Sequence, residues 1–232
     1  MRLPFLRRRA RGPEHYPDGP LRSLAASPPL PDTTPVSEVE LLALDVETTG
    51  LDPASDHLLS LGWVPVAGGR VVLAEARELR VRPPQGVDVG ASATLHRLTD
   101  DALSDAAPLS EALPPLLEAL HGRVLLAHHA TLEVEFVAAA ARTSYGARPP
   151  VTAVDTLALQ HRLQADEHGE VSGSLRLDAA RRAYGLPRYA AHDALTDAVA
   201  AAELFLAQVA ELERRLGREP LLRDLAPRRS AS

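Results

Sequence analysis

Two carboxylate side chains whose spacing suits metal chemistry lie early in the chain, in the segment LALDVETTGLDP. Asp45 and Glu47 come at the end of an apolar run that predicts a buried strand. Residues two apart on a strand point to the same face, so the two carboxylates project together. They repel one another and raise each other's pKa unless a cation lies between them, and hard oxygen ligands favour Mg²⁺ or Mn²⁺ over zinc. The pair therefore indicates a divalent metal site, although Asp-x-Glu alone also suits a solvated strand end.

A third acidic residue, Asp197, begins the segment DAVAAAELFLAQV, which is apolar almost all round and is expected to form a buried helix. A carboxylate at the start of such a helix is costly unless it is paired or bound to a metal, although it also suits the positive end of the helix dipole. His192 precedes Asp197 by five residues, which is roughly 140° around an ideal helix. The two side chains therefore cannot share one helix face, and His192 is expected to lie in the preceding loop.

A fourth acidic residue, Glu133, follows the apolar segment RVLLAH, which predicts a strand, and falls in the first turn of a predicted helix. Parallel strands in α/β sheets bring their carboxyl ends to one edge of the sheet. Glu133 is therefore expected to face the region that Asp45 and Glu47 reach. Stabilisation of the helix N-terminus explains an acid at this position equally well.

The residues that are absent exclude several kinds of chemistry. The 232-residue chain has no Cys, and all 25 of its basic residues are Arg. Thiolate nucleophiles, disulfides, Cys-bound zinc, lysine Schiff bases and P-loop lysines are therefore excluded. The net charge of −6 gives no overall basic character for nucleic-acid binding. A carboxylate site that binds divalent metals nevertheless reverses its own local charge.

The elements that must position these residues follow from the hydrophobic pattern. Strands are predicted over residues 41–46, 57–66, 70–81, 123–128 and 151–156. Helices are predicted over residues 107–120, 131–146, 155–165, 175–184 and 194–215. A three-stranded antiparallel unit followed by strand–helix–strand units predicts an α/β fold, a mixed five-stranded sheet with helices on both faces.

The two ends of the chain differ from this central region. Residues 1–38 are rich in Pro and Arg without sustained periodicity, which predicts an N-terminal arm, either extended along the domain or flexible. The folded domain is predicted over residues 39–216, with a C-terminal tail at 217–232, and removal of the arm is expected to leave that domain folded. No apolar run reaches membrane-spanning length and no signal-peptide core follows the basic start. A cytoplasmic protein with no membrane partner is therefore expected.

Taken together, the motifs resemble one family. The patterns D-x-E-T-T-G-L-D-P, A-H-x-A-x-x-acid-x-x-F and H-x4-D, in this order, are similar to those of the DEDDh 3′→5′ exonucleases. This DnaQ-like family includes the proofreading epsilon subunit of bacterial DNA polymerase III. The resemblance spans about residues 40–210. It implies a ribonuclease H-like fold and hydrolysis of phosphodiester bonds, from a free 3′ end of nucleic acid, to nucleoside 5′-monophosphates.

The resemblance also implies a role for each acidic residue. Two ions, Mg²⁺ or Mn²⁺, are expected to bind, with Asp45 bridging both, Glu47 and Asp197 holding the first, and Glu133 assisting the second. His192, whose ordinary pKa lies near neutrality, is expected to be the general base that takes a proton from the attacking water.

The same resemblance implies residues that hold the terminal nucleotide. Thr48 is expected to grip it together with the backbone of the Thr-Thr-Gly turn. The segment ATLHRLT resembles the His-Gly-Ile-Thr substrate loop of the family, so His96 and Leu98 are expected to line the nucleotide pocket.

Two positions depart from the family pattern. His129 stands where the family has Asn, and Glu133 where it has Asp, while Phe136 matches the family's aromatic residue and sets this register. Three alternatives stay open beside a free-standing exonuclease that prefers DNA. They are an RNA-trimming exonuclease or oligoribonuclease, a catalytically weakened nucleic-acid-binding module, and a subunit dedicated to a polymerase or another protein partner.

Overall fold

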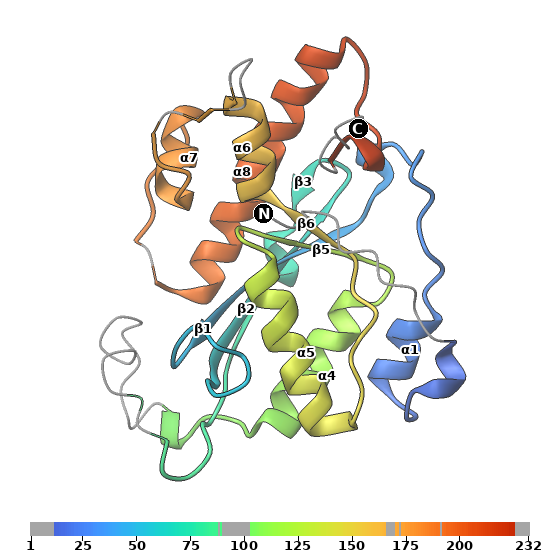
Figure 1. The fold of residues 1–232 in the computed structure, drawn as a ribbon, viewed down its shortest axis with the longest axis vertical. Coiled ribbons are helices and arrows are strands. Elements are labelled where there is room, and N and C mark those ends of the chain that lie inside the picture. The colour runs from blue at the N-terminus through green and yellow to red at the C-terminus, as the bar shows by residue number, and fades with distance from the viewer. Residues whose placement is uncertain are drawn as a thin grey trace.

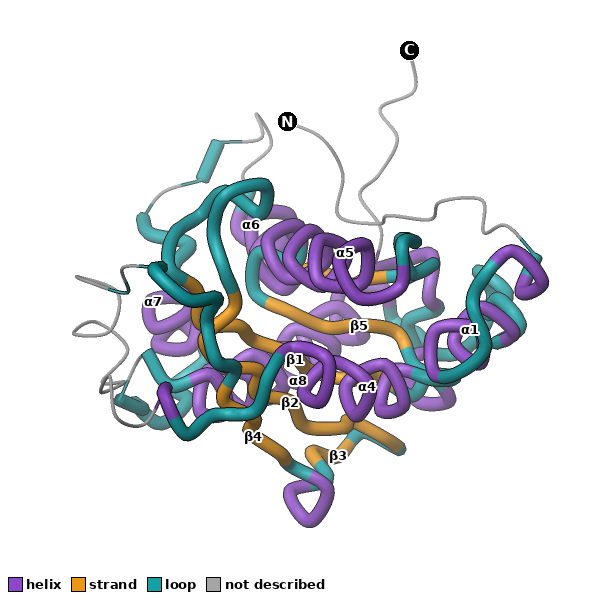
Figure 2. Tube along the Cα trace, turned by 90° about the horizontal axis from the view of Figure 1, so that it is seen from below, coloured by secondary structure: helices purple, strands orange, loops and turns teal. Residues whose placement is uncertain are grey.

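The computed structural model describes residues 12–87, 89, 103–165, 170–171, 173–190 and 192–225. In this part of the chain, one sheet has the strand order β3-β2-β1-β5-β6, and β4 also pairs with β2. Its strands are β1 (Leu41–Thr48), β2 (Leu58–Ala67), β3 (Arg70–Val71), β4 (Arg77–Arg80), β5 (Val124–Ala127) and β6 (Ala153–Asp155). β2 is antiparallel to β1, β3 and β4, whereas β1, β5 and β6 are parallel. The predicted mixed sheet is therefore confirmed (Figures 1 and 2).

Helices lie on both faces of this sheet. The α-helices are α1 (Pro20–Ala26), α4 (Leu109–Leu120), α5 (Thr131–Tyr145), α6 (Thr156–Gln164), α7 (Leu177–Ala183) and α8 (Ala194–Leu216). Short 3-10 turns are η1 (Pro13–His15), η2 (Val36–Glu38), η3 (Leu73–Glu75) and η4 (Leu222–Leu225). In Figure 1, α6, α7 and α8 lie together in the upper part of the view, and α1, α4 and α5 lie below.

The alternation of side chains along β1 builds both cores. Leu42 and Leu44 are buried in a cluster formed with α1, α4 and α5. Leu41 and Ala43 are buried in a second cluster, on the other side of the sheet, together with residues of α6 and α8. Since successive strand residues point to opposite faces, the same alternation continues toward the polar end of β1 and decides which face its carboxylates occupy.

The predicted third strand, 70–81, is interrupted, which corrects the expectation of one continuous element. β3 and β4 both pair with β2, but residues 72–76 between them stand opposite only Val64 and Pro65. The carbonyl of Pro65 accepts from the amide of Val72 at 2.9 Å, so this proline presents its backbone to the β3–β4 side. Because proline has no N–H to continue the ladder, the chain leaves the sheet there and forms η3.

The N-terminal segment lies against the domain within the part of the chain that the structure describes. Leu21 and Leu24 of α1 are buried in the same cluster as α4 and α5. Ser27 accepts a hydrogen bond from the amide of Gly122, just after α4, at 3.1 Å. Of the two forms predicted for the arm, extended along the domain or flexible, residues 12–38 adopt the packed one. This packing argues against removing residues 1–38 without effect on folding.

The segment after α8 also packs on the domain. α8 ends at Gly217, which has a φ of 66°, a left-handed conformation that favours glycine. The chain then turns back, and Leu222 donates from its amide to the carbonyl of Thr34 while Val36 donates to the carbonyl of Pro220. Leu222 and Leu225 are buried beside α8 and η2. The predicted tail therefore contributes to the second core as far as residue 225.

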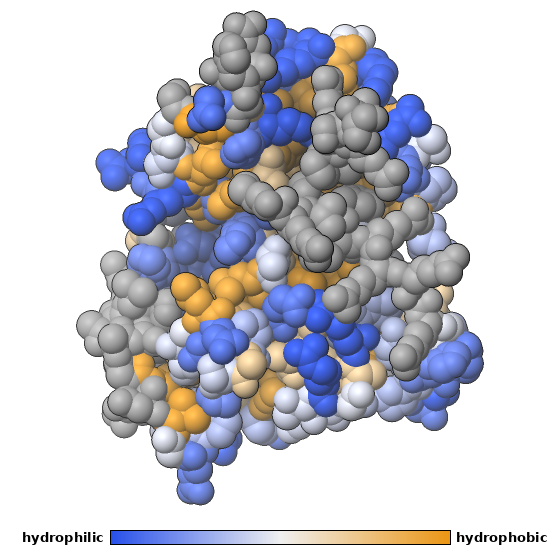
Figure 3. Space-filling model, viewed as in Figure 1, coloured by the Kyte–Doolittle hydropathy of each residue, from blue (hydrophilic) through white to orange (hydrophobic). Residues whose placement is uncertain are grey.

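Hydrophilic residues cover much of the face shown in Figure 3, with apolar residues gathered in smaller patches between them. Among the described residues, the large apolar side chains that are exposed are Leu51, Leu73 and Tyr189. No helix in the described part of the chain is long and apolar enough to span a membrane.

Candidate active site

Strand β1 delivers the first two acidic residues to the face covered by α8. Asp45 and Glu47 continue the alternation of Leu41 and Ala43, whose side chains pack toward α8. One carboxylate oxygen from each of Asp45, Glu47 and Asp197 lies within 4.8 Å of the others. The structure therefore brings together acidic residues that are far apart in the chain, since 152 positions separate residue 45 from residue 197.

A close approach between α8 and β2 makes this grouping possible. Gly62 of β2 lies directly opposite Asp45 in the antiparallel register. A Cβ atom added to Gly62 would collide with the backbone of Ala194 and Leu195, in the first turn of α8. Asp193 caps the same helix end by accepting from the amide of Thr196 at 2.8 Å. Only glycine at position 62 allows the start of α8 to lie this close to the strand beside Asp45.

Burial is the largest cause that raises the pKa values of all three carboxyls, and neighbouring acidic residues add to the rise. Burial, followed by the charges of Asp197, Asp193 and Glu78, raises the pKa of Glu47 to about 8. The pKa of Asp45 is raised by burial first and then by Glu133, Asp197 and Glu47. At neutral pH such a group either binds protons and loses negative charge, or keeps its negative charges because cations compensate them.

The pKa of Asp197 is also raised, but some of its neighbours oppose the rise. Burial raises it, whereas a hydrogen bond from the backbone of His192 and the charges of His192 and Arg181 lower it. Asp197 is therefore the carboxylate of the group on which an arginine acts.

Glu133, in the first turn of α5, lies beside the group of three without belonging to it. Its side chain is buried, with 2% of its surface exposed. Its Oε2 atom has no hydrogen-bond partner in the described part of the chain. Burial raises the pKa of Glu133, and the nearby charge of Asp155 adds to the rise. A buried carboxylate oxygen without a partner is costly, so its presence beside three further carboxylates fits a hard divalent cation at this place.

His192 lies outside α8, as expected from its spacing to Asp197. Its φ of 70° places it in the left-handed region, which is uncommon for a residue with a side chain. Its backbone amide donates to Oδ2 of Asp197 at 2.9 Å. His192 is exposed, and this hydrogen bond keeps the residue beside the acidic group.

The residues expected to hold a nucleotide are described only in part. The hydroxyl of Thr48 donates to the carbonyl of Gly50 and so shapes the turn after β1. Thr49 and Asp56 tie the rest of this turn together through a hydrogen bond of 3.0 Å. His96 and Leu98 lie outside the described residues.

Asp155 and Arg181 are two residues of this region that the sequence motifs did not single out for a role. Asp155, at the end of β6, accepts from the amides of His129 and Leu157, at 2.9 Å each, and caps α6. An acid between a strand and a helix was the available signal for this residue. Arg181 is buried in α7, and an arginine within RRAYG gave no signal in the sequence.

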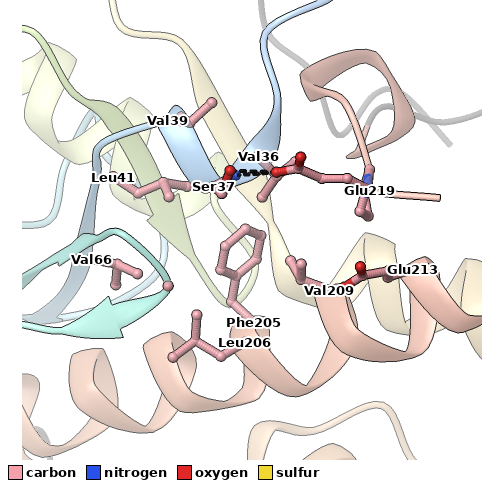
Figure 4. Close-up of a pocket in the computed structure, with 12 residues that line it drawn as sticks. Val36, Ser37, Val39, Leu41, Val66, Phe205, Leu206, Val209, Glu213 and Glu219 are labelled. Atoms are coloured by element: carbon pink, nitrogen blue, oxygen red, sulfur yellow. Dashed lines mark hydrogen bonds between the residues drawn. The ribbon is translucent and has the colours of Figure 1, made fainter.

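A cavity of about 300 Å³ lies away from this group. It is lined by residues of η2, β1, β2 and α8, among them Val36, Leu41, Phe205 and Val209, with Glu213 and Glu219 at its polar side (Figure 4). Leu41 is at the beginning of β1, whereas the carboxylates are at its end. The cavity is therefore not the site of the acidic cluster.

Comparison with known proteins identifies the family to which the chain is similar. Residues 42–205 match the family model RNase_T, described as exonuclease. The chain is 31% identical to DNA polymerase III subunit epsilon of Treponema pallidum over 74% of this chain and 77% of that protein. It is 31% identical to the PolC-type DNA polymerase III of Caldanaerobacter subterraneus subsp. tengcongensis over 76% of this chain, but this match covers only 12% of that polymerase.

Solved structures show the same fold. The structure of E. coli exonuclease I in complex with a dT13 oligonucleotide matches with a TM-score of 0.65 at 15% identity, covering 77% of this chain and 42% of that chain. Exonuclease I from Methylocaldum szegediense matches with a TM-score of 0.64 at 20% identity, covering 77% and 41%. The predicted ribonuclease H-like α/β fold is thereby confirmed. With a family match across most of its length, the chain belongs to the RNase_T exonuclease family.

Proposed function

We propose that this chain is a 3′→5′ exonuclease that hydrolyses single-stranded nucleic acid, DNA in preference to RNA, to nucleoside 5′-monophosphates with two divalent metal ions. The observation that carries the proposal is the convergence of Asp45, Glu47 and Asp197 within 4.8 Å of one another. The buried Oε2 of Glu133 beside them, which has no hydrogen-bond partner among the described residues, supports it. A group of this kind, held between a strand and two helix ends, suits phosphoryl chemistry that requires metal ions.

The donor set decides which ions fit. Carboxylate oxygens are hard ligands, which suits Mg²⁺ or Mn²⁺. Asp45, Glu47 and Asp197 would hold one ion, and Asp45 with Glu133 the second. When bound, these ions supply a more acidic water molecule and stabilisation of the negative charge that develops on the phosphate and the leaving 3′ oxygen.

The chain's own residues supply the rest of the chemistry. His192 accepts the proton of the attacking water on its imidazole, and its backbone bond to Asp197 keeps it at the site. The turn that begins at Thr48, stiffened by the Thr49–Asp56 hydrogen bond, binds the terminal nucleotide through its backbone, together with His96 and Leu98. We place this reaction in the cytoplasm.

The proposed preference for DNA rests on the names of the related proteins and on the ligand of one related structure. Several are DNA polymerase III proteins, and one structural neighbour is in complex with a dT13 oligonucleotide. A polymerase or another protein partner belongs to the same proposal, because the epsilon-like relatives are named as polymerase subunits.

One assay tests the metal-dependent 3′→5′ reaction. Single-stranded DNA and RNA of one sequence, labelled at the 5′ end, are incubated with the protein in EDTA and after addition of Mg²⁺ or Mn²⁺. We expect a ladder shortened from the 3′ end, 5′-monophosphate products and faster decay of DNA, all abolished by EDTA and by Asp45→Asn. Asp178→Asn is the control, since Asp178 is an exposed carboxylate paired with Arg182. Undiminished activity in chelator overturns the proposal, and faster decay of RNA reverses its substrate preference.

A further inference from the structure

Arg181 is a buried charge that lies outside the group of acidic residues. It lies on α7, and its side chain is only 4% exposed. A guanidinium in such a place is costly unless its donors are paired. It donates from Nη1 to the carbonyl of Ala200 at 2.6 Å, and from Nη2 to the carbonyl of Pro187 at 2.9 Å. A third donation, from Nη2, reaches Oε2 of Glu203 at 2.7 Å.

These partners come from two places only. Ala200 and Glu203 belong to α8, and Pro187 belongs to the segment that connects α7 to α8. Tyr189, in the same segment, places its ring 4.5 Å from the guanidinium carbon of Arg181, and its hydroxyl donates to Oε1 of Glu203 at 2.9 Å. Arg181, Glu203 and Tyr189 therefore form a closed cluster that joins the connecting segment to α8; we refer to it as the Arg181 cluster.

The position of this cluster on α8 matters for the site. Ala200 and Glu203 lie one and two turns beyond Asp197, roughly 4.5 and 9 Å along the helix at ~1.5 Å per residue. The connecting segment ends at His192, three residues after Tyr189, where the backbone of His192 bonds to Asp197. The same helix thus holds the segment at two points, one near Pro187 and Tyr189 and one at His192.

We propose that Arg181, through Glu203 and Tyr189, is a positioning residue for His192. It fixes the connecting segment on α8, so that His192 keeps the left-handed backbone that brings its imidazole to the acidic group. Without the cluster, the segment would lose its attachment to α8 at Pro187 and Tyr189. The inference rests on the proposed role of His192 as general base and adds a residue that does not touch substrate or metal.

A double-mutant cycle tests this inference on the full chain. Arg181→Gln and Tyr189→Ala are each made in the native sequence and in His192→Ala, and kcat and KM are measured on 3′-labelled single-stranded DNA with saturating Mn²⁺. We expect each single variant to lower kcat by up to about 10²-fold with little change in KM, because misplacement of a catalytic group by ~1 Å has that effect. In the His192→Ala background neither variant should lower kcat further, because residues that act through one group are not additive.

Conservative and control variants sharpen the result. Arg181→Lys keeps the charge beside Glu203 but loses the forked donors, and its kcat should fall between those of the native protein and Arg181→Gln. Arg182→Gln is the matched control, since the neighbouring Arg182 pairs with Asp178 and is exposed; its kcat should be native. Tyr189 is 42% exposed, so Tyr189→Ala carries the test if Arg181→Gln does not fold.

The outcomes distinguish the positioning role of Arg181 from the general-base role of His192 and from the exonuclease proposal. A fall in kcat of the same size in both backgrounds overturns the positioning role while leaving the exonuclease proposal intact. Native kcat in both Arg181→Gln and Tyr189→Ala also overturns it. Native kcat in His192→Ala alone overturns the assignment of the general base together with this inference. Absence of metal-dependent cleavage by the native protein contradicts the proposed function itself.

Discussion

Glu133 is the residue at which this chain departs most from the family pattern that it resembles. Glutamate keeps the charge of aspartate and reaches one methylene further. The structure has this carboxylate buried, with one oxygen unpartnered in the described part of the chain. A longer and more flexible ligand suits an ion that tolerates distorted coordination, whereas Mg²⁺ requires near-octahedral geometry.

Exchange of Glu133 for alanine should therefore abolish activity nearly completely, and the native protein should be more active with Mn²⁺ than with Mg²⁺. The matched control is Glu135→Ala. Glu135 is on the same helix but forms a forked ion pair with Arg148, 2.7 Å from Nη1 to Oε2. Loss of this partly exposed pair should cost at most about 1 kcal/mol of stability and leave cleavage unchanged. Steady-state cleavage rates measure both variants, and inactive Glu135→Ala with active Glu133→Ala would show that the second motif is out of register.

The raised carboxyl pKa values make the stability of the metal-free protein depend on pH. Burial and neighbouring acids raise the pKa of Glu47 from 4.5 to about 8 in the folded state. Between these values the folded state binds more protons than the unfolded state, so stability falls as pH rises. The contribution is most favourable below about pH 4.5 and is lost as pH passes through about 8.

Urea unfolding in EDTA at several pH values should show this decline, and Mn²⁺ should stabilise the protein more at pH 8 than at pH 5.5. The reason is that protons compete with the metal for the same carboxylates at the lower pH. Glu47→Gln removes the titrating group and should flatten the profile in EDTA. A metal-free protein whose stability rises steadily from pH 5 to 8 contradicts the electrostatic account of the site.

At the scale of elements, the contact between β2 and α8 controls the spacing of the acidic group. Gly62 faces Asp45 in the sheet, and the backbone of Ala194 occupies the place where a Cβ would be. Gly62→Ala should push the first turn of α8 outward and move Asp197 away from Asp45. We expect weaker Mn²⁺ binding by calorimetry and a large loss of activity.

A matched control separates this effect from simple destabilisation. Val64 is on the same strand and is fully buried against the second core, so Val64→Ala should lower stability by roughly 2 kcal/mol through its cavity. Its Mn²⁺ affinity should stay native, because Val64 lies opposite Ala43 in the sheet, whereas Gly62 lies opposite Asp45. Equal losses of Mn²⁺ affinity in the two variants would mean that the glycine contributes only stability.

At the scale of the whole molecule, both ends of the described chain contribute to its cores. Leu21 of α1 is fully buried against α4, so Leu21→Ala should cost about 2–5 kcal/mol. Deletion of residues 1–38 should lower the urea midpoint further, because it exposes the apolar face of α4 that α1 covers. Arg22→Ala on the same helix is the control, since Arg22 is partly exposed and pairs with Asp18. A deletion variant with native stability would show that the packing of α1 is without energetic consequence.

Local patterns in the sequence determined the elements and the candidate residues. Alternation on β1 predicted that Asp45 and Glu47 share a face, and five-residue spacing predicted that His192 precedes the helix that Asp197 enters. These are properties of neighbours a few residues apart, which period and propensity govern. The same reasoning predicted a single strand over 70–81, and this prediction was wrong. The interruption is caused by the missing N–H of Pro65, a residue of another strand, and the local sequence of 70–81 does not show which strand it pairs with.

Only the tertiary structure decided what brings the acidic residues together and what holds them there. The contact of Gly62 with α8, the burial of Glu133 and the pairing of Arg181 with Glu203 and Pro187 join segments far apart in the chain. The residues next to a glycine or an arginine in the sequence do not specify which distant segment it will contact. Packing selects the partner, because a buried charge or a close backbone approach is tolerated only where another element completes it.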